Sequence, residues 1–142
     1  MQSYANHSQI VPLYHRVLSA LILLTLIGAC VNLYESWGDH QRLYSASLIV
    51  ALCFIAVLFF WFVRIFPLRA QDRAIRAEEN LRSFAMTGKL LDPRLTVRQI
   101  IALRFASDGE FPALAQRAAE EKMTPDAIKR AVKQWRADEY RV

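Results

Sequence analysis

The stretch that decides the fold is "SLIVALCFIAVLFFWFV", Ser47–Val63, which contains no charged side chain. It belongs to an uncharged run over residues 45–63, and a second uncharged run covers residues 17–33. At about 1.5 Å per residue these runs make helices of roughly 26 to 29 Å, close to the hydrocarbon thickness of a bilayer. A chain of 142 residues has too little other material to cover two helices that are apolar all round. The sequence therefore predicts a transmembrane hairpin, residues 17–63, with spans at about residues 17–34 and 45–63.

Charge is distributed unevenly around these runs and predicts their orientation. The net charge of +5 arises entirely from Arg64 onward, whereas the connecting loop, Tyr34–Tyr44, has two acidic residues against one arginine. An excess of Lys and Arg next to a span marks the cytoplasmic side of the membrane. We expect both termini in the cytoplasm, the loop outside, and contacts to anionic lipid headgroups from Arg64, Arg69, Arg73 and Arg76.

Residues 1–16 are polar and aromatic and precede the first run. We expect this segment to lie along the cytoplasmic membrane surface. The stretch "LIGAC", Leu26–Cys30, looks like a lipoprotein processing box, but a long leader with a single charge precedes it, so we expect an intact first helix. Cys30 and Cys53 lie within the predicted spans and are expected to act as small apolar residues rather than as a disulfide.

Small and bulky side chains are distributed along both spans. Small residues let helices approach closely in lipid, which predicts packing between the two spans. The small residues expected at this contact are Ser19, Thr25, Gly28, Ala29, Ser47 and Ala51. A bulky face of the second span is expected to meet lipid or a larger partner, and it consists of Phe54, Phe59, Phe60, Trp61 and Phe62.

The stretch "RAQDRAIRAEENLR", Arg69–Arg82, follows the second span and predicts a basic juxtamembrane helix over residues 64–88. Pro67 suits the first turn of a new helix, and Gly88 suits its end. Ion pairs within reach at i,i+4 are Asp72–Arg76 and Glu78–Arg82. An apolar seam at spacings of 4, 3, 4 and 3 is expected to dock the C-terminal helices, and it comprises Ala70, Ala74, Ala77, Leu81 and Phe84. The alternative is an ordinary solvated helix.

Residues 89–142 predict a cytoplasmic unit of three short helices. Thr96 and Gln99 have the spacing of a capping box, and Thr124-Pro125-Asp126 is typical of a helix start. The expected fold class is all-α: a two-helix transmembrane hairpin, a juxtamembrane helix and a small cytoplasmic helical domain.

Chemistry-bearing patterns are missing from the sequence. We find no nucleophile–base pair, no Cys/His metal spacing and no glycine-rich phosphate loop, and the three histidines all lie at or before His40. We therefore expect a non-enzymatic protein without catalytic, cofactor-binding or metal-binding residues.

The main rival interpretation is a membrane-tethered nucleic-acid-binding regulator. Three short helices with a basic last helix resemble a helix-turn-helix in outline, and Lys129, Lys133 and Arg136 would share one face of that helix. Neighbouring acidic residues dilute this positive field, so a nucleic-acid partner is disfavoured.

Several strings together resemble a family of small bacterial two-span membrane proteins whose function is unknown. They are "YANHSQIVPLYH", "LRAQDRAIRAEENLR", "TGKLLDPRLT", "IIALRFASD" and "WRADEYRV". The resemblance implies a membrane hairpin, a bacterial inner membrane and a cytoplasmic C-terminal domain, and it implies no activity and no catalytic residue.

These observations favour a non-catalytic accessory or scaffold subunit that anchors or stabilises a larger inner-membrane complex, respiratory or photosynthetic in kind. Its expected partners are the lipid bilayer and other membrane subunits. A self-associating membrane protein, a homo-oligomer, is the nearest alternative.

Overall fold

The computed structural model of the chain describes residues 3–5 and 10–138, and this part is helical. A six-residue π-helix, η1 (Leu13–Leu18), leads directly into the first α-helix. The α-helices are α1 (Ser19–Glu35), α2 (His40–Thr87), α3 (Val97–Leu103), α4 (Phe111–Glu120) and α5 (Pro125–Ala131). Within the described residues no strand forms beyond an isolated bridge between Ala106 and Trp135. The expected all-α class is confirmed.

Two compact units make up the described chain, and helix α2 contributes to both. One unit comprises residues 10–66, and the other comprises residues 67–138 together with residues 3–5. The expected juxtamembrane segment, residues 64–88, thus belongs mostly with the C-terminal helices rather than forming a part of its own.

In the unit of residues 10–66, helix starts earlier than the sequence predicted. Pro12 occupies the N-cap position with φ of −60°, and the helix that follows it includes residues 13–16, which lie before the predicted span. The turn to α2 is short, because Gly38 adopts φ of +100° and the Asp39 carboxylate accepts hydrogen bonds from the first backbone amides of α2. The expected loop over Tyr34–Tyr44 contracts to residues 36–39.

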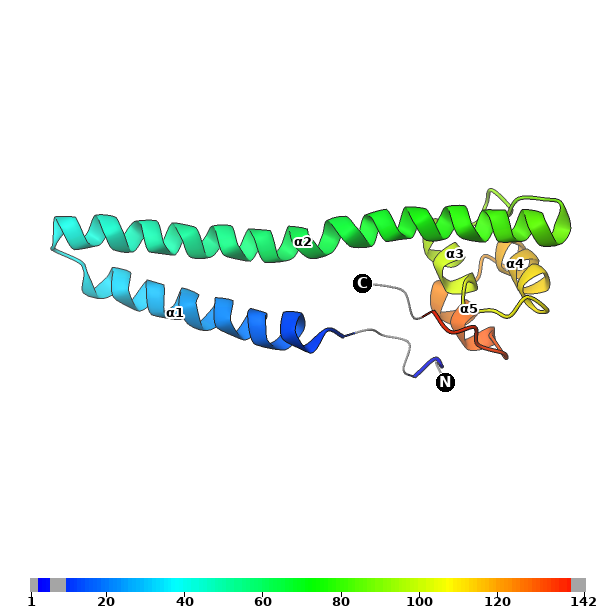
Figure 1. Ribbon diagram of the computed structural model, residues 1–142, viewed down its shortest axis with the longest axis horizontal. Helices are drawn as coiled ribbons and strands as arrows, with labels where there is room; N and C mark the ends of the chain where they lie inside the picture. The colour runs from blue at the N-terminus through cyan, green and yellow to red at the C-terminus, as the bar shows by residue number, and fades with distance from the viewer. Residues whose placement is uncertain (1–2, 6–9, 139–142) are drawn as a thin grey trace. The chain divides into compact units, whose positions relative to one another are not determined.

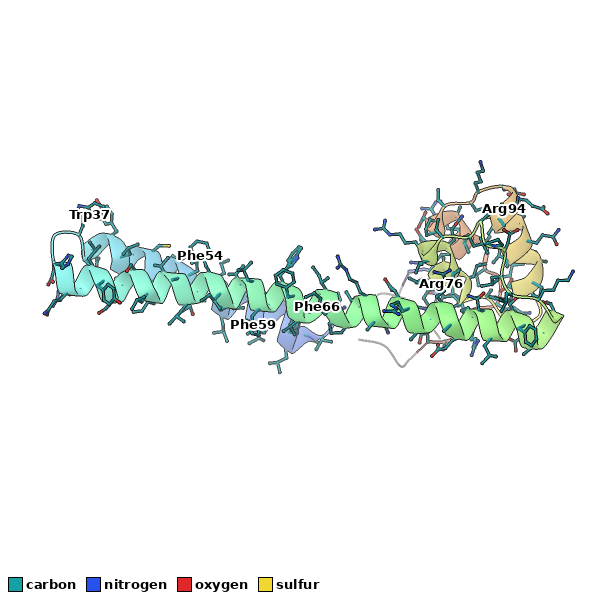
Figure 2. The ribbon with its side chains drawn as sticks, turned by 90° about the horizontal axis from the view of Figure 1, so that it is seen from above. Trp37, Phe54, Phe59, Phe66, Arg76 and Arg94 are labelled. Atoms are coloured by element: carbon teal, nitrogen blue, oxygen red, sulfur yellow. The ribbon has the colours of Figure 1, made fainter. Side chains whose placement is uncertain are left out.

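Two helical segments, Leu13–Glu35 and His40–Thr87, are long and apolar enough to cross a membrane. Few side chains in their most apolar stretches are buried by the rest of the protein. Figure 1 shows α1 running back along the first part of α2, and Figure 2 labels Trp37 at the turn with Phe54, Phe59 and Phe66 along α2. The apolar side chains therefore face outward over most of this unit.

Pro67 lies inside α2 and does not begin a new helix. The expectation that a new helix starts at Pro67 is wrong. A proline in a helix lacks the backbone N–H that would reach the carbonyl four residues earlier, so the carbonyl of Val63 loses its usual helical donor. The boundary between the two compact units falls at this residue.

The unit of residues 67–138 packs α3, α4 and α5 around a small apolar core (Figure 1). Thr96 and Gln99 form the expected capping box, and the Thr124 hydroxyl accepts from the Ala127 amide at 3.2 Å. The largest side chains that are fully buried are Phe105, Phe111, Leu103 and Ile128. Side-chain caps at the starts of α3 and α5, together with a shared core, thus hold the three short helices.

Candidate functional site

Arg82 is the centre of a buried charge cluster that joins α2 to the C-terminal helices. Its guanidinium donates to Glu79 at 3.0 Å, to Asp108 at 2.6 Å and to the Ala106 carbonyl at 2.7 Å. It also lies 4.3 Å from the ring centroid of Phe111. The Arg82 and Glu79 side chains are 10% and 8% exposed, so their ion pair forms largely out of water, whereas the Asp108 side chain is 74% exposed. A bifurcated, charge-assisted arrangement of this kind orients two elements rigidly.

The face of α2 that meets the C-terminal helices differs from the predicted seam. Ile75, Glu79 and Ser83 are buried, one turn apart from each other along α2. Every residue of the predicted seam is exposed instead: Ala70, Ala74, Ala77, Leu81 and Phe84. Leu81 and Phe84 are 68% and 53% exposed. The prediction that the seam docks the C-terminal helices is wrong, because a buried ionic cluster with Ile75 occupies the docking face.

The arginines after the apolar stretch point to solvent, as a surface-contact role requires. Arg69, Arg73 and Arg76 are exposed, and Arg64 is half-buried. Within the described part of the chain, none of the four forms an ion pair. The expected pairs from Asp72 to Arg76 and from Glu78 to Arg82 are therefore not formed.

Glu110 secures the segment that follows α5. Its carboxylate accepts from the backbone amides of Lys133 and Gln134, each at 3.1 Å, and from Ser107 at 3.3 Å. The Arg136 amide also donates to the Phe105 carbonyl at 2.8 Å. No pattern in the sequence indicates that the Glu110 side chain binds a segment more than twenty residues away.

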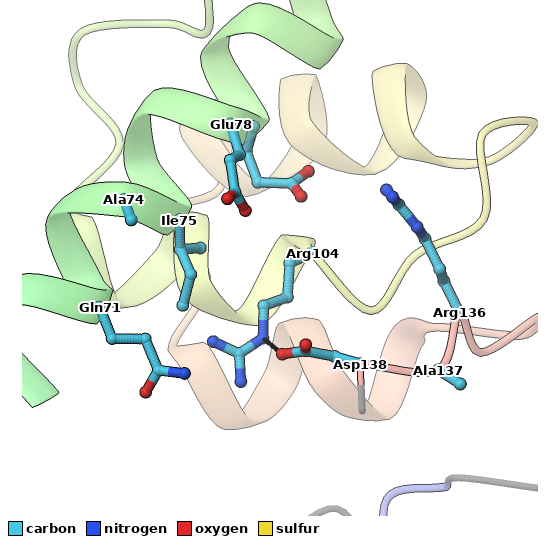
Figure 3. A pocket seen from close by; sticks show the side chains of 9 residues that line it. Gln71, Ala74, Ile75, Glu78, Arg104, Arg136, Ala137 and Asp138 are labelled. Carbon is cyan, nitrogen blue, oxygen red and sulfur yellow. Dashed lines mark ion pairs between the residues drawn. The ribbon is translucent and has the colours of Figure 1, made fainter. Parts of the chain in front are cut away.

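A polar cavity of about 200 Å³ lies between α2 and the segment after α5. Figure 3 shows Glu78 of α2, Arg104 at the end of α3 and Asp138 of the last described segment around it. Arg104 and Asp138 form an ion pair at 2.9 Å, and Arg104 lies 4.6 Å from the ring centroid of Phe105. Small-molecule sites usually enclose about 300 to 1,000 Å³ and are mostly apolar, so this small mixed-charge cavity fits a structural junction better.

Tyr4 contacts α5, which the expected membrane-surface placement of residues 1–16 did not include. Its hydroxyl donates to Asp126 at 2.6 Å and accepts from Arg130 at 3.2 Å, and the Arg130 guanidinium lies 5.2 Å from the Tyr4 ring centroid. The hydrogen bond from Tyr4, followed by the charge of Asp126, raises the pKa of Arg130 above its ordinary value. This contact ties residues 3–5 to the C-terminal helices.

The contact between the two apolar helices uses only part of the predicted set of small residues, and it includes others. Ala29, Ala46 and Cys53 are buried, and both cysteines are free thiols. Of the predicted set, Ala29 is buried and Ser19 is half-buried. The others are exposed: Thr25, Gly28, Ser47 and Ala51. A Cβ atom added to Gly28 would meet no atom within 4 Å, so this glycine does not serve a close helix approach.

The predicted bulky face is exposed except at Phe60. The Phe60 ring stacks on Tyr14 with centroids 4.5 Å apart, and the Tyr14 hydroxyl donates to the Phe60 carbonyl. Phe60 therefore belongs to the contact between the helices. Phe54, Phe59, Trp61 and Phe62 remain 45% to 68% exposed. A shallow apolar groove of about 490 Å³ runs along this part of α2, lined by Ile55, Leu58, Phe59, Phe62, Val63 and Phe66.

The basic helix face required by the nucleic-acid interpretation does not form. Helix α5 ends at Ala131, so Lys133 and Arg136 follow the helix in non-helical backbone. Lys129 lies 5.9 Å from the ring centroid of Phe105, and Arg130 is paired with Asp126 at 3.0 Å. The expectation that Lys129, Lys133 and Arg136 share one helical face is wrong.

Among residues 3–5 and 10–138, no group of three or more His, Cys, Asp or Glu side chains could hold a metal ion. The described residues offer three exposed surfaces: the apolar outer surface of the helices, the groove and the exposed face of α2.

Comparison with known proteins places the chain in a family. The family model described as "Family of unknown function (DUF6526)" matches residues 1–142, so the chain belongs to this family. No curated protein and no solved structure matches the chain.

Proposed function

We propose that this protein, a member of a family with no assigned function, is a non-catalytic accessory or scaffold subunit of a larger complex in the bacterial inner membrane. Two membrane spans anchor it, both termini lie in the cytoplasm, and its C-terminal helices form a small cytoplasmic unit. Its partners are the bilayer and at least one other membrane subunit, in a complex of respiratory or photosynthetic type.

The observation that carries the proposal is the apolar surface of the two long helices, which the rest of the protein leaves uncovered. Leu24 is 65% exposed, Phe59 is 68% exposed and Trp61 is 63% exposed. Water would oppose so large an exposed apolar surface, whereas lipid or a partner helix would not. A core helix of a soluble protein can be equally long and apolar, but most of its side chains would be covered by the rest of the protein.

The apolar groove on α2 supports a partner within the membrane. Phe59 and Phe62 line it, and their rings leave a depression that a neighbouring helix could fill. Packing of complementary surfaces drives helix association in lipid, where burial from water contributes nothing. The orientation follows from Arg64, Arg69, Arg73 and Arg76, which place the positive charge after the second span.

The test is mild detergent extraction of the tagged full-length chain from its own host, followed by sizing and mass spectrometry of the co-purifying chains. We expect the protein to stay in the membrane during alkaline carbonate washing and to co-purify in a fixed ratio with another membrane subunit. The double variant Phe59→Ala/Phe62→Ala should lose that subunit. Phe54→Ala, an equally exposed position outside the groove, is the matched control and should retain it.

Extraction by carbonate alone would contradict the membrane anchor. Equal recovery of the partner by the groove variant and by the control would contradict the contact through α2. Purification of the full-length chain without any other subunit in several mild detergents would contradict the accessory role.

A further inference from the structure

The exposed seam of α2 has the spacing of a two-stranded coiled coil. Its residues are Ala70, Ala74, Ala77, Leu81 and Phe84, and their mean spacing is 3.5 residues. In heptad notation Ala74 and Leu81 occupy a positions, and Ala70, Ala77 and Phe84 occupy d positions. A strict 3.5-residue repeat keeps one narrow seam facing a partner helix over successive turns.

Most of the seam lies away from the C-terminal helices, and only Ala74 of its five residues lines the polar cavity between α2 and the segment after α5. The buried residues Ile75, Glu79, Arg82 and Ser83 fall at positions b, f, b and c of the same heptads. The chain's own core therefore leaves the a and d positions open. A solvated helix has no need of Leu81 and Phe84 on its outer side, where they are 68% and 53% exposed.

Charges beside the seam indicate which partner fits it. Arg73 occupies a g position and Glu78 the e position of the next heptad, five residues later. In a parallel pair of identical helices each g side chain faces the e side chain five residues later on the partner, so Arg73 of each copy meets Glu78 of the other. Neither residue forms an ion pair elsewhere in the described part of the chain.

An antiparallel arrangement would face g with g and e with e, which sets arginine against arginine and glutamate against glutamate. Two copies inserted in one membrane with the same topology enter this segment from the same side of the membrane, which is compatible with a parallel pair. The charge pattern therefore selects the parallel orientation, and the shared topology allows it. The argument from shared topology rests on the membrane insertion that is proposed above.

We propose that residues 70–84 of α2 form a parallel two-fold contact with a second copy of this chain. Alanine at three of the five positions lets the helices approach closely at the end nearer the apolar stretch, and Leu81 and Phe84 supply the larger apolar contacts beyond it. Two heptads are short for a coiled coil in water. Confinement of both copies to one membrane raises their effective concentration and compensates for this. The contact is isologous, so it closes at two copies.

Cysteine cross-linking of the full-length chain in membranes tests the geometry. In a background with Cys30 and Cys53 replaced by alanine, single cysteines are introduced by Ala70→Cys, Ala74→Cys and Ala77→Cys. Mild oxidation should give a disulfide-linked dimer for all three. The matched controls Arg69→Cys and Arg76→Cys lie at c positions on the same exposed stretch and should give at least severalfold less. Equal yields at seam and control positions, or no dimer at any seam position, would overturn the proposal.

Charge reversal tests the partner and the orientation. In the Ala77→Cys background, Arg73→Glu or Glu78→Arg alone should lower dimer yield about threefold to tenfold, because two attractive contacts become repulsive. The double reversal Arg73→Glu/Glu78→Arg restores both attractive contacts and should recover the parental yield. Failure of the double variant to recover, with the C-terminal helices still protease-resistant, would rule out the paired contact.

The outcomes separate this proposal from the proposed function. A chain that resists carbonate and co-purifies with another subunit, but gives no seam cross-link, contradicts only the two-fold contact. A cross-link from Ala77→Cys to a different chain also overturns it, because another protein would then occupy the seam. A chain that carbonate removes contradicts the membrane anchor whatever its cross-linking pattern.

Discussion

Arg82 of α2 and Asp108 of the turn before α4 are joined by a hydrogen-bonded ion pair of 2.6 Å, although 26 positions separate them in sequence. The same guanidinium binds Glu79, and the Arg82 and Glu79 side chains are each about nine-tenths buried. This cluster decides which side of α2 the C-terminal helices cover.

Removal of the Arg82 guanidinium should release the C-terminal helices. Arg82→Ala leaves Glu79 as a buried carboxylate without its cation and should cost about 3 to 5 kcal/mol of the unfolding free energy of this unit. Pulse proteolysis of the detergent-solubilised chain measures the change. The double variant Arg82→Met/Glu79→Leu removes both buried charges and should recover most of the loss. A double variant as unstable as Arg82→Ala would show that packing, not the unpaired charge, sets the cost.

Two acidic substitutions on α2 should differ strongly in effect. Ile75→Asp buries a charge at a position that is 6% exposed and should cost roughly 3 kcal/mol or more. Leu81→Asp changes a position that is exposed within the single chain, so in the detergent-diluted monomer it should alter the stability of the same unit by about 0.5 kcal/mol or less. Limited proteolysis compares the two variants directly. Rapid cleavage of Leu81→Asp with an intact Ile75→Asp would place the docking face on the predicted seam after all.

The arginines after the apolar stretch should hold the helix near anionic lipid. Arg69→Gln/Arg76→Gln leaves Arg73 for the two-fold contact and removes two exposed cations, each worth about 1 kcal/mol near a negatively charged surface. Cross-linking to a photoactivatable anionic lipid in reconstituted vesicles should fall, and the residual signal, which Arg64 and Arg73 support, should depend less on salt. Arg94→Gln/Arg117→Gln is the control of equal charge. A fall of the same size in that control would mean that the effect is one of net charge only.

Topology can be tested with single cysteines placed by the structure. Ser36 is 6% exposed and unsuitable, whereas Trp37 is 80% exposed at the turn and Gln116 is exposed on α4. In a chain with Cys30 and Cys53 replaced by alanine, a membrane-impermeant maleimide should label Trp37→Cys in intact spheroplasts. It should label Gln116→Cys only after lysis. The reverse pattern would invert the proposed orientation.

Asp92 should titrate abnormally in the folded protein. Hydrogen bonds from the side chain and backbone of Arg94 lower the pKa of Asp92 to about 2, from 3.8. The folded state favours the charged carboxylate, so the small stabilisation is present above about pH 4 and is lost as the pH falls toward 2. Carbon-detected NMR of the carboxyl group gives the pKa directly. In Arg94→Gln the pKa should rise toward its ordinary range, and an unchanged value would exclude Arg94 as the cause.

The sequence alone determined the features that depend on local pattern. Uncharged runs of span length predicted two long apolar helices, and capping residues at Thr96 and Thr124 predicted the starts of α3 and α5. Gly88 marked the end of α2 and adopts φ of +71°. Each of these signals lies within a few residues of the feature that it predicts, so no knowledge of distant partners was needed.

Only the tertiary structure decided which faces of the helices meet. Residues 70–84 carry an apolar seam on one side and the buried set of Ile75, Glu79 and Arg82 on another, and sequence periodicity favoured the seam. The choice between them depends on Asp108 and the Ala106 carbonyl, which lie 24 to 26 residues away and satisfy a guanidinium that would otherwise be too costly to bury. The same holds for Tyr14 on Phe60 and Glu110 on the Lys133 amide, because a hydrogen bond between distant segments leaves no periodic trace in the sequence.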